Sequence, residues 1–252
     1  MGIPSARVNV LLFEPAELGP DGTVHLAGRR AAHVREVLRA VPGDHLLAGV
    51  VGGRLGQARV LADGAEGLVL SPALDREPPP PAPVSLLLAL PRPKILRRVL
   101  QAATAMGVKR IALVGSYRVE KSFFASPLLE PAALRDELLL GLEQGRDTVL
   151  PEVTLHRFFK PFLEDLLDLA FPEPVRLLAH TAEAEPIEAH APAGPRAVLA
   201  IGPEGGWTPY EAERLREKRF LPVTLGPRPL RVDAAVPYAV GQVELWLRRG
   251  RG

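Results

Sequence analysis

The stretch AVLAIGPEGGWTPYE, residues 197–211, decides the fold class of this chain. Its uninterrupted apolar start, Ala-Val-Leu-Ala-Ile, is typical of a strand buried on both faces of a sheet. The strand leads into a turn with three glycines, which lack a Cβ and so let the backbone approach a ligand closely. Thr208, Pro209 and Glu211 then predict a capping box at the start of a helix. This turn is therefore expected to be held at both ends, by a strand and by a capped helix.

The same alternation of strands and helices extends over residues 84–252. Apolar runs predict strands at 84–90, 110–114, 153–156, 175–180 and 222–225. Helical spacing predicts helices at 93–106, 131–144, 161–169, 209–219 and 234–248. This order predicts an α/β fold, with a mostly parallel sheet and flanking helices, whose ligands bind in loops after the carboxyl ends of strands.

Two loops of this kind carry candidate chemistry. In the first, residues 201–207, a glycine-rich turn alone is weak evidence, but Glu204 inside it favours a ligand site over a simple tight turn. The second is LGPRPLRVD, residues 225–233, where Asp233 is predicted to cap the final helix. Arg231 either contacts a ligand or pairs with Asp233, and the sequence leaves both open. We expect the two turns to emerge from neighbouring strands.

Residues 1–74 have a different pattern. Strands are predicted at 8–13, 46–51, 55–61 and 67–70, with one helix at 29–41. Such a pattern is typical of a small β-barrel, which either grips nucleic acid or only packs. The stretch DREPPPPAP, residues 75–83, is predicted to be an extended linker to the second domain, residues 84–252.

The net charge of +2 conceals a basic block. Between residues 91 and 122 eight basic residues stand against Glu120 alone: Arg92, Lys94, Arg97, Arg98, Lys109, Arg110, Arg118 and Lys121. This block indicates either a polyanion site or a solvated helix face.

Other classes of site are disfavoured. The chain has no cysteine, which excludes disulfides and thiolate metal sites and fits a reducing cytosol. No apolar run is long enough to span a bilayer, and no signal peptide is predicted at the start. Dinucleotide, P-loop and nucleophile-elbow motifs are missing, and the six histidines lack metal-ligand spacing, so no metal is expected.

Five motifs in order resemble the RsmE-type methyltransferase family of the SPOUT superfamily. Residues 200–211 and 224–236 are similar to the family's paired patterns iGPEGGfs..E and LG.RiLR.ETA. Residues 25–46, 90–111 and 142–153 are similar to its H...VLR...GD, LpK.dk.e.iiqKatELGv..I and EQs.R..vPev elements. The resemblance covers nearly the whole chain, and the ordered set is more specific than any one motif.

The resemblance implies a cytoplasmic S-adenosylmethionine (SAM)-dependent enzyme that methylates N3 of a uridine in 16S ribosomal RNA. It implies a PUA-like N-terminal barrel, a SPOUT domain with a trefoil knot, and a homodimer acting on 16S ribosomal RNA or the small ribosomal subunit. Carried over residue by residue, the SAM-binding positions are Ala179, His180, Ile201, Gly202, Pro203, Glu204, Gly205, Gly206, Leu225, Gly226, Leu230 and Arg231.

Methyl transfer from a sulfonium is an in-line displacement, so alignment dominates its catalysis. The N3 proton of the uridine must leave, and an arginine would stabilise the resulting anion. The candidates are Arg231 for the anion and Glu204 for positioning the base or accepting the proton. The alternative is that Glu204 only orders loop amides and Arg231 only pairs with Asp233. The residues expected to contact RNA are Arg29, Arg35, Arg39, Arg92, Lys94, Arg97, Arg98, Arg118 and Arg146.

Departures from the family pattern keep two alternatives open. Val232-Asp233-Ala234-Ala235 replaces the usual Thr-Glu-Thr-Ala, and Ala105-Met106-Gly107 replaces Glu-Leu-Gly. These changes spare the cofactor loops but weaken inference about the target nucleotide. The alternatives are a SPOUT methyltransferase with a different RNA target and a catalytically silent RNA-binding factor of ribosome assembly.

Overall fold

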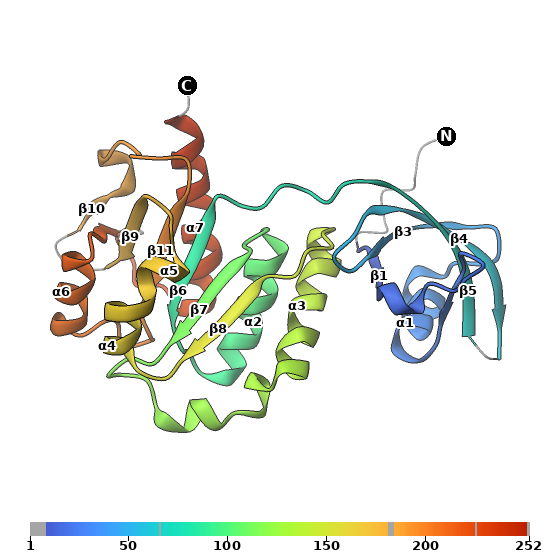
Figure 1. The fold of residues 1–252 in the computed structure, drawn as a ribbon, viewed down its shortest axis with the longest axis horizontal. Coiled ribbons are helices and arrows are strands. Elements are labelled where there is room, and N and C mark those ends of the chain that lie inside the picture. The colour runs from blue at the N-terminus through green and yellow to red at the C-terminus, as the bar shows by residue number, and fades with distance from the viewer. Residues whose placement is uncertain (1–8, 66, 181–183, 225, 251–252) are drawn as a thin grey trace. The chain divides into compact units, whose positions relative to one another are not determined.

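The computed structural model describes residues 9–250, except residues 66, 181–183 and 225. The chain divides into two compact units (Figure 1). The first comprises Met1–Pro80 and Leu139–Leu150, and the second comprises Pro81–Leu138 and Pro151–Gly252. None of the helices in the described residues is long and apolar enough to cross a membrane.

The first unit is built on a five-stranded sheet in the order β1-β3-β4-β5-β2. Its elements are β1 (Leu11–Phe13), β2 (Val24–Leu26), α1 (Gly28–His33), β3 (His45–Val50), β4 (Leu55–Gly64) and β5 (Gly67–Arg76). Only the β1–β3 pairing is parallel. Within the described part of the chain no pairing joins β1 to β2, so this sheet is open and the closed barrel stays a prediction.

The apolar face of this sheet carries the core of the first unit. Phe13, Val24, Leu26 and Leu70 are buried there against Val34, which follows α1. The predicted helix 29–41 is shorter than expected, because a π turn at Val34–Leu38 ends it and Arg39 adopts a left-handed φ of 49°. Strand β2 was not predicted, since three residues are too few for a periodic signal.

The boundary between the units also differs from the predicted one. Strand β5 extends to Arg76, into the predicted linker. Residues 139–150, predicted to belong to the second domain, group with the first unit instead. Leu142 packs there with Val10, Leu12 and Leu55, and the Thr148 hydroxyl donates to the Gly53 carbonyl at 2.5 Å. Such long-range packing leaves no mark on local composition, so the sequence does not reveal it.

The second unit contains a seven-stranded sheet in the order β10-β12-β9-β11-β6-β7-β8. Its strands are β6 (Val84–Ala89), β7 (Arg110–Val114), β8 (Glu152–His156), β9 (Val175–Ala179), β10 (Glu185–Pro186), β11 (Ala197–Ile201) and β12 (Leu221–Thr224). All of its pairings are parallel, as predicted. Every residue of the central strands β6 and β11 is buried, which explains their apolar runs without alternation.

Helices flank this sheet. They are α2 (Pro93–Ala105), α3 (Pro131–Gly145), α4 (Phe159–Pro161), α5 (Leu167–Ala170), α6 (Pro209–Glu217) and α7 (Val232–Arg249). Helix α7 packs beside α2 and against β6 and β11 (Figure 1). A π turn at Phe162–Leu166 divides the predicted helix 161–169 into α4 and α5. The observed α/β fold with a mostly parallel sheet and flanking helices confirms the predicted class for this unit.

Candidate functional site

Three of the predicted loops follow adjacent strands of the parallel sheet. Strand β9 pairs with β11 on one side and with β12 on the other, both in parallel. The carboxyl ends of all three strands therefore meet at one edge of the sheet, which is where ligands of such sheets bind. The expectation that the two turns leave neighbouring strands is wrong, because β9 lies between β11 and β12. The end of β9 carries the third predicted segment, Ala179 and His180.

The turn after β11 has the tight geometry that its glycines predict. Gly206 has a φ of +72°, and its amide donates to the Pro203 carbonyl at 2.7 Å. A Cβ added to Gly202 would lie only 2.9 Å from the Trp207 backbone nitrogen. Gly202 and Pro203 are buried, whereas Glu204 and Gly205 are exposed. The turn is therefore tightly closed, its first residues are buried, and Glu204 is exposed to solvent.

The predicted capping box begins helix α6. The Thr208 hydroxyl accepts from the Glu211 amide, and a Glu211 carboxylate oxygen accepts from the Thr208 amide at 2.9 Å. The other carboxylate oxygen of Glu211 accepts from the Tyr117 amide at 2.8 Å. Glu211 is only 3% exposed, so this buried carboxylate joins the loop after β7 to the helix that follows the glycine-rich turn. The sequence predicts the first role but not the second.

Arg118 makes a second connection between the same two loops. Its guanidinium donates to the Gly205 carbonyl, and its side chain lies 3.1 Å from the position of a Cβ on Gly205. Arg118 was predicted to contact RNA, and the structure places it against the predicted cofactor turn instead of free in solvent. It is still an exposed residue, so the contact with Gly205 does not remove it from the RNA-binding prediction.

The predicted loop after β12 leads directly into α7. Leu225 lies outside the described residues, whereas Gly226 has a φ of +113° and Leu230 is 40% exposed. The prediction that Asp233 caps the final helix is wrong: the cap position is Arg231, and α7 begins at Val232. Asp233 instead lies in the first turn, where a carboxylate is stabilised by the amide ends of the helix.

Asp233 pairs with two arginines. Arg98 Nη1 lies 3.0 Å from one of its oxygens, and Arg231 Nε lies 3.5 Å from the other. The Arg231 side chain is nevertheless 72% exposed. Both roles that the sequence left open for Arg231 are therefore compatible with its position, because an exposed guanidinium in a loose ion pair is able to turn toward a ligand.

Acids that lie far away in the sequence balance part of the basic block. Arg97 pairs with Glu137 at 2.7 Å, and Arg98 pairs with Asp233. Arg92 and Lys94, at the start of α2, are exposed and have no ion-pair partner among the described residues. In the first unit Arg35 pairs with Asp63 at 2.6 Å and Arg29 lies 3.7 Å from Glu143. The other predicted RNA contacts, Arg39 and Arg146, are also exposed.

These pairings predict unequal contributions to RNA binding. We expect the double variant Arg92→Ala, Lys94→Ala to lower the slope of log affinity against log salt by about one to two, since each phosphate contact releases about one counterion. Arg97→Ala is expected to change the slope less, because Arg97 must first leave Glu137 to reach a phosphate. Filter binding of 16S RNA fragments at a series of salt concentrations measures both slopes, and equal slopes for all variants would contradict the assignment.

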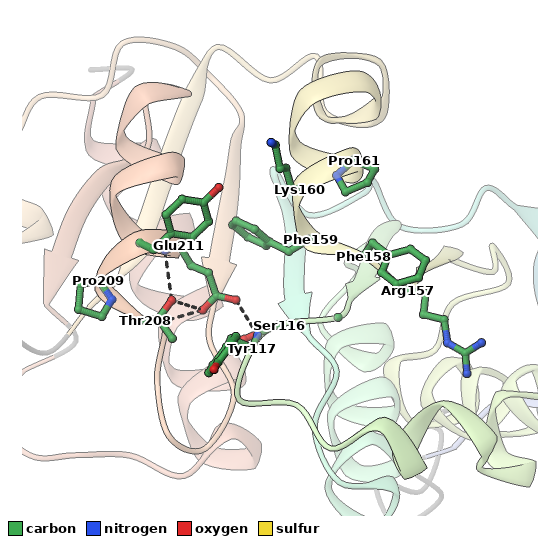
Figure 2. A pocket seen from close by; sticks show the side chains of 12 residues that line it. Ser116, Tyr117, Arg157, Phe158, Phe159, Lys160, Pro161, Thr208, Pro209 and Glu211 are labelled. Carbon is green, nitrogen blue, oxygen red and sulfur yellow. Dashed lines mark hydrogen bonds between the residues drawn. The ribbon is translucent and has the colours of Figure 1, made fainter.

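A pocket of about 650 Å³ opens beside the capping box (Figure 2). Its residues come from the loop after β7, from the segment after β8 and from the start of α6: Gly115, Ser116, Tyr117, Arg157, Phe158, Phe159, Lys160, Pro161, Thr208, Pro209, Tyr210 and Glu211. The sequence did not single out its aromatic residues, because they come from three separate segments. The only available signal was that aromatic and basic residues stand together at 157–160.

One histidine lies directly before this pocket-lining segment. Burial lowers the pKa of His156, so its imidazole is neutral at neutral pH. The ring packs against Phe162 at 4.3 Å between centroids, and its Nε2 lies 3.0 Å from the Thr154 hydroxyl. These contacts give His156 a structural role at the end of β8.

Comparisons with known proteins agree with this geometry. The RNA methyltransferase domain family matches residues 78–244. The ribosomal RNA small subunit methyltransferase E of Treponema pallidum is 30% identical over 96% of this chain and 94% of its own length. The enzyme of the same name from Neisseria gonorrhoeae, solved bound to S-adenosyl methionine, has a TM-score of 0.71, 23% identity and coverage of 94% and 98% of the two chains. A SAM-bound methyltransferase from Legionella pneumophila has a TM-score of 0.74, 22% identity and coverage of 94% and 98%.

The matched family spans the whole sheet of the second unit, including the three loops at its carboxyl edge. The relative from Treponema pallidum extends the similarity over the first unit as well. The chain belongs to the RNA methyltransferase family that includes the ribosomal RNA small subunit methyltransferases E.

Proposed function

We propose that this chain is a SAM-dependent methyltransferase that methylates N3 of a uridine in 16S ribosomal RNA. The observation that carries the proposal is the strand order β11-β9-β12, which brings the three predicted cofactor loops to one edge of a parallel sheet. The relative from Treponema pallidum and the neighbour from Neisseria gonorrhoeae bear the name of an enzyme of the small-subunit ribosomal RNA. The solved neighbours from Legionella pneumophila and Neisseria gonorrhoeae contain SAM.

The residues at this edge suit a nucleoside cofactor. Gly206 and Gly226 have positive φ, and a Cβ on Gly202 would meet the backbone of its own turn, so glycine allows these loops to fold tightly at the edge where the ligand would bind. SAM supplies an electrophilic methyl group on a sulfonium. Residues 179–180, 201–206 and 225–231 would hold it, with backbone amides and carbonyls reading its polar groups.

The protein's own side chains must accept the N3 proton of the uridine and stabilise the negative charge that remains on the ring. Glu204 is exposed at the glycine-rich turn and accepts the N3 proton or positions the base. Arg231 has an exposed guanidinium at the start of α7 and stabilises the anionic ring. The uridine leaves its stack to reach these groups unless it is already unpaired.

Four further features belong to the proposal because the family resemblance implies them. They are a trefoil knot at the cofactor loops, a PUA-like role for the first unit in binding RNA, a homodimer and a cytoplasmic location. The linker after β5 would then connect an RNA-binding domain, residues 1–74, to the methyltransferase domain, residues 84–252. The exposed Arg29, Arg35 and Arg39 are the candidates for RNA contact in this domain.

Analysis of ribosomal RNA nucleosides from a deletion strain tests the reaction. We expect 3-methyluridine to disappear from 16S RNA and to return when the wild-type gene is restored. Loss of another methylated nucleoside instead would assign a different RNA target. Calorimetry of the purified protein with SAM tests the cofactor, and the lack of any binding would indicate a catalytically silent RNA-binding factor.

A further inference from the structure

The pocket beside the capping box has two walls that come from different parts of the second unit. Tyr117, Thr208 and Pro209 line one wall, and Phe158 and Lys160 line the other (Figure 2). Its volume of about 650 Å³ lies within the usual range for sites that hold small ligands. None of the described residues that are predicted to bind the cofactor lines it.

Three aromatic side chains of this pocket are largely exposed. Tyr117 is 89% exposed, Phe158 67% and Tyr210 58%. Exposed aromatic rings grouped in one concave site mark a surface that binds a partner. Flat rings that face a shared space are the platforms on which unpaired nucleic acid bases stack, because every base has a π face.

The charges around these rings favour an anionic partner. Arg157 and Lys160 are the basic residues of the described lining. The Arg157 guanidinium is held 5.6 Å from the centre of the Phe124 ring, and the Lys160 ammonium makes only a long, 3.9 Å contact with Glu164 outside the pocket. Glu211 is the one acidic residue among the described lining residues, and its two oxygens already accept hydrogen bonds from Thr208 and Tyr117. An apolar peptide would gain nothing from the two cations, whereas a phosphodiester would.

Two contacts tie the pocket to the predicted cofactor turn. Thr208 follows residues 201–207 directly, and Arg118, the neighbour of Tyr117, donates to the Gly205 carbonyl. The pocket therefore adjoins the turn that would hold the cofactor. Ser116 adds a polar group, since its buried hydroxyl has no hydrogen-bond partner among the described residues.

We propose that this pocket holds a second, unpaired RNA base next to the target uridine. The base stacks on Tyr117 or Phe158, and its phosphate lies toward Arg157 and Lys160. This inference rests on the proposed function, because it takes the substrate to be RNA. It adds a site that reads the flanking nucleotide and fixes the register of the target.

A fluorescent base tests the stacking directly. The probe is a short single-stranded RNA around the target uridine, with 2-aminopurine placed on its 5′ side in one version and on its 3′ side in another. We expect wild-type protein to quench one of the two, and the alanine variant at the ring that carries the base, Tyr117→Ala or Phe158→Ala, to relieve the quenching and weaken RNA binding about tenfold. SAM affinity, measured by calorimetry, should stay within twofold of wild type.

Matched variants separate stacking from charge and from folding. Tyr117→Phe keeps the ring and should bind as wild type does, and so should Leu169→Ala, which removes an 82% exposed apolar side chain outside the pocket. Lys160→Ala should lower the salt slope by less than about one, because the ammonium must first leave Glu164, whereas the ring variants should leave the slope unchanged. Thermal unfolding of each variant reports whether the fold is retained.

Two outcomes would overturn the inference while leaving the proposed function intact. One is wild-type RNA affinity and unchanged quenching in the ring variants of an enzyme that still methylates. The other is loss of self-association in Tyr117→Ala by sedimentation, which would assign the pocket to a second copy of the chain. If the wild-type protein binds SAM but methylates no RNA, the proposed function itself fails.

Discussion

Replacing Arg231 by alanine is expected to lower kcat for RNA methylation by about 100- to 1,000-fold, the usual loss when a preorganised group that stabilises a developing anion is removed. SAM affinity should change little, because the Arg231 side chain is proposed to stabilise the base, whereas SAM would be held by backbone groups of the loop. Its side chain is 72% exposed, and its ion-pair partner among the described residues, Asp233 at 3.5 Å, keeps its pairing with Arg98 when Arg231 is removed. Single-turnover methylation of 16S RNA, with calorimetry for SAM, measures both quantities.

Two variants distinguish direct action of Arg231 from structural pairing. Asp233→Asn removes the partner but keeps the guanidinium, and we expect at least a tenth of the wild-type rate to remain. If Asp233→Asn loses as much activity as Arg231→Ala, the ion pair and not the guanidinium is what the reaction needs. Arg248→Ala, at the other end of α7 and 64% exposed, is the matched control for the loss of one positive charge.

Replacing Gly202 by alanine is expected to weaken SAM binding by about 10- to 100-fold. The new Cβ would lie 2.9 Å from the Trp207 nitrogen and 3.2 Å from the Gly206 carbonyl carbon, and backbone atoms cannot turn aside as a flexible side chain does. The whole turn must therefore shift by a few tenths of an ångström or more. Small displacements of groups that position a ligand weaken its binding and slow its reaction. Calorimetric titration with SAM measures the effect.

Gly241→Ala is the matched control for this substitution. Gly241 lies inside α7, where an added Cβ meets nothing within 4 Å. Alanine is favoured over glycine in a helix interior by about 1 kcal/mol, so this variant should be slightly more stable than wild type and should bind SAM normally. Wild-type SAM affinity in Gly202→Ala would show that the turn after β11 does not hold the cofactor.

Features that depend on neighbours in the chain were predictable from the sequence. The capping box from Thr208 to Glu211 spans four residues, and the apolar runs of β6 and β11 follow from burial on both faces of a parallel sheet. The order of strands and helices in the second unit, and so its fold class, follows from such local signals. The ordered motifs across the chain also indicated the family that the comparisons then established.

The predictions were wrong where they considered one segment alone and left out charged residues far away in the sequence. Asp233 was predicted as a cap because its residue type suits that position, but its carboxylate is held by Arg98, 135 residues away. The basic block seemed nearly unopposed because Glu137 lies outside it in the sequence, yet pairs with Arg97. In both cases the two partners of an ion pair are close in space but far apart in the sequence, so the sequence does not reveal the pair.

By itself, the sequence determined most of the elements, their order along the chain and the family, because periodicity, caps and motifs are properties of short segments. The tertiary structure alone decided that β9 lies between β11 and β12, that residues 139–150 join the first unit, and that three segments form the aromatic pocket. The physical reason is that strand order and side-chain packing minimise the free energy of the whole chain. A pairing between residues 100 positions apart depends on every element that lies between them.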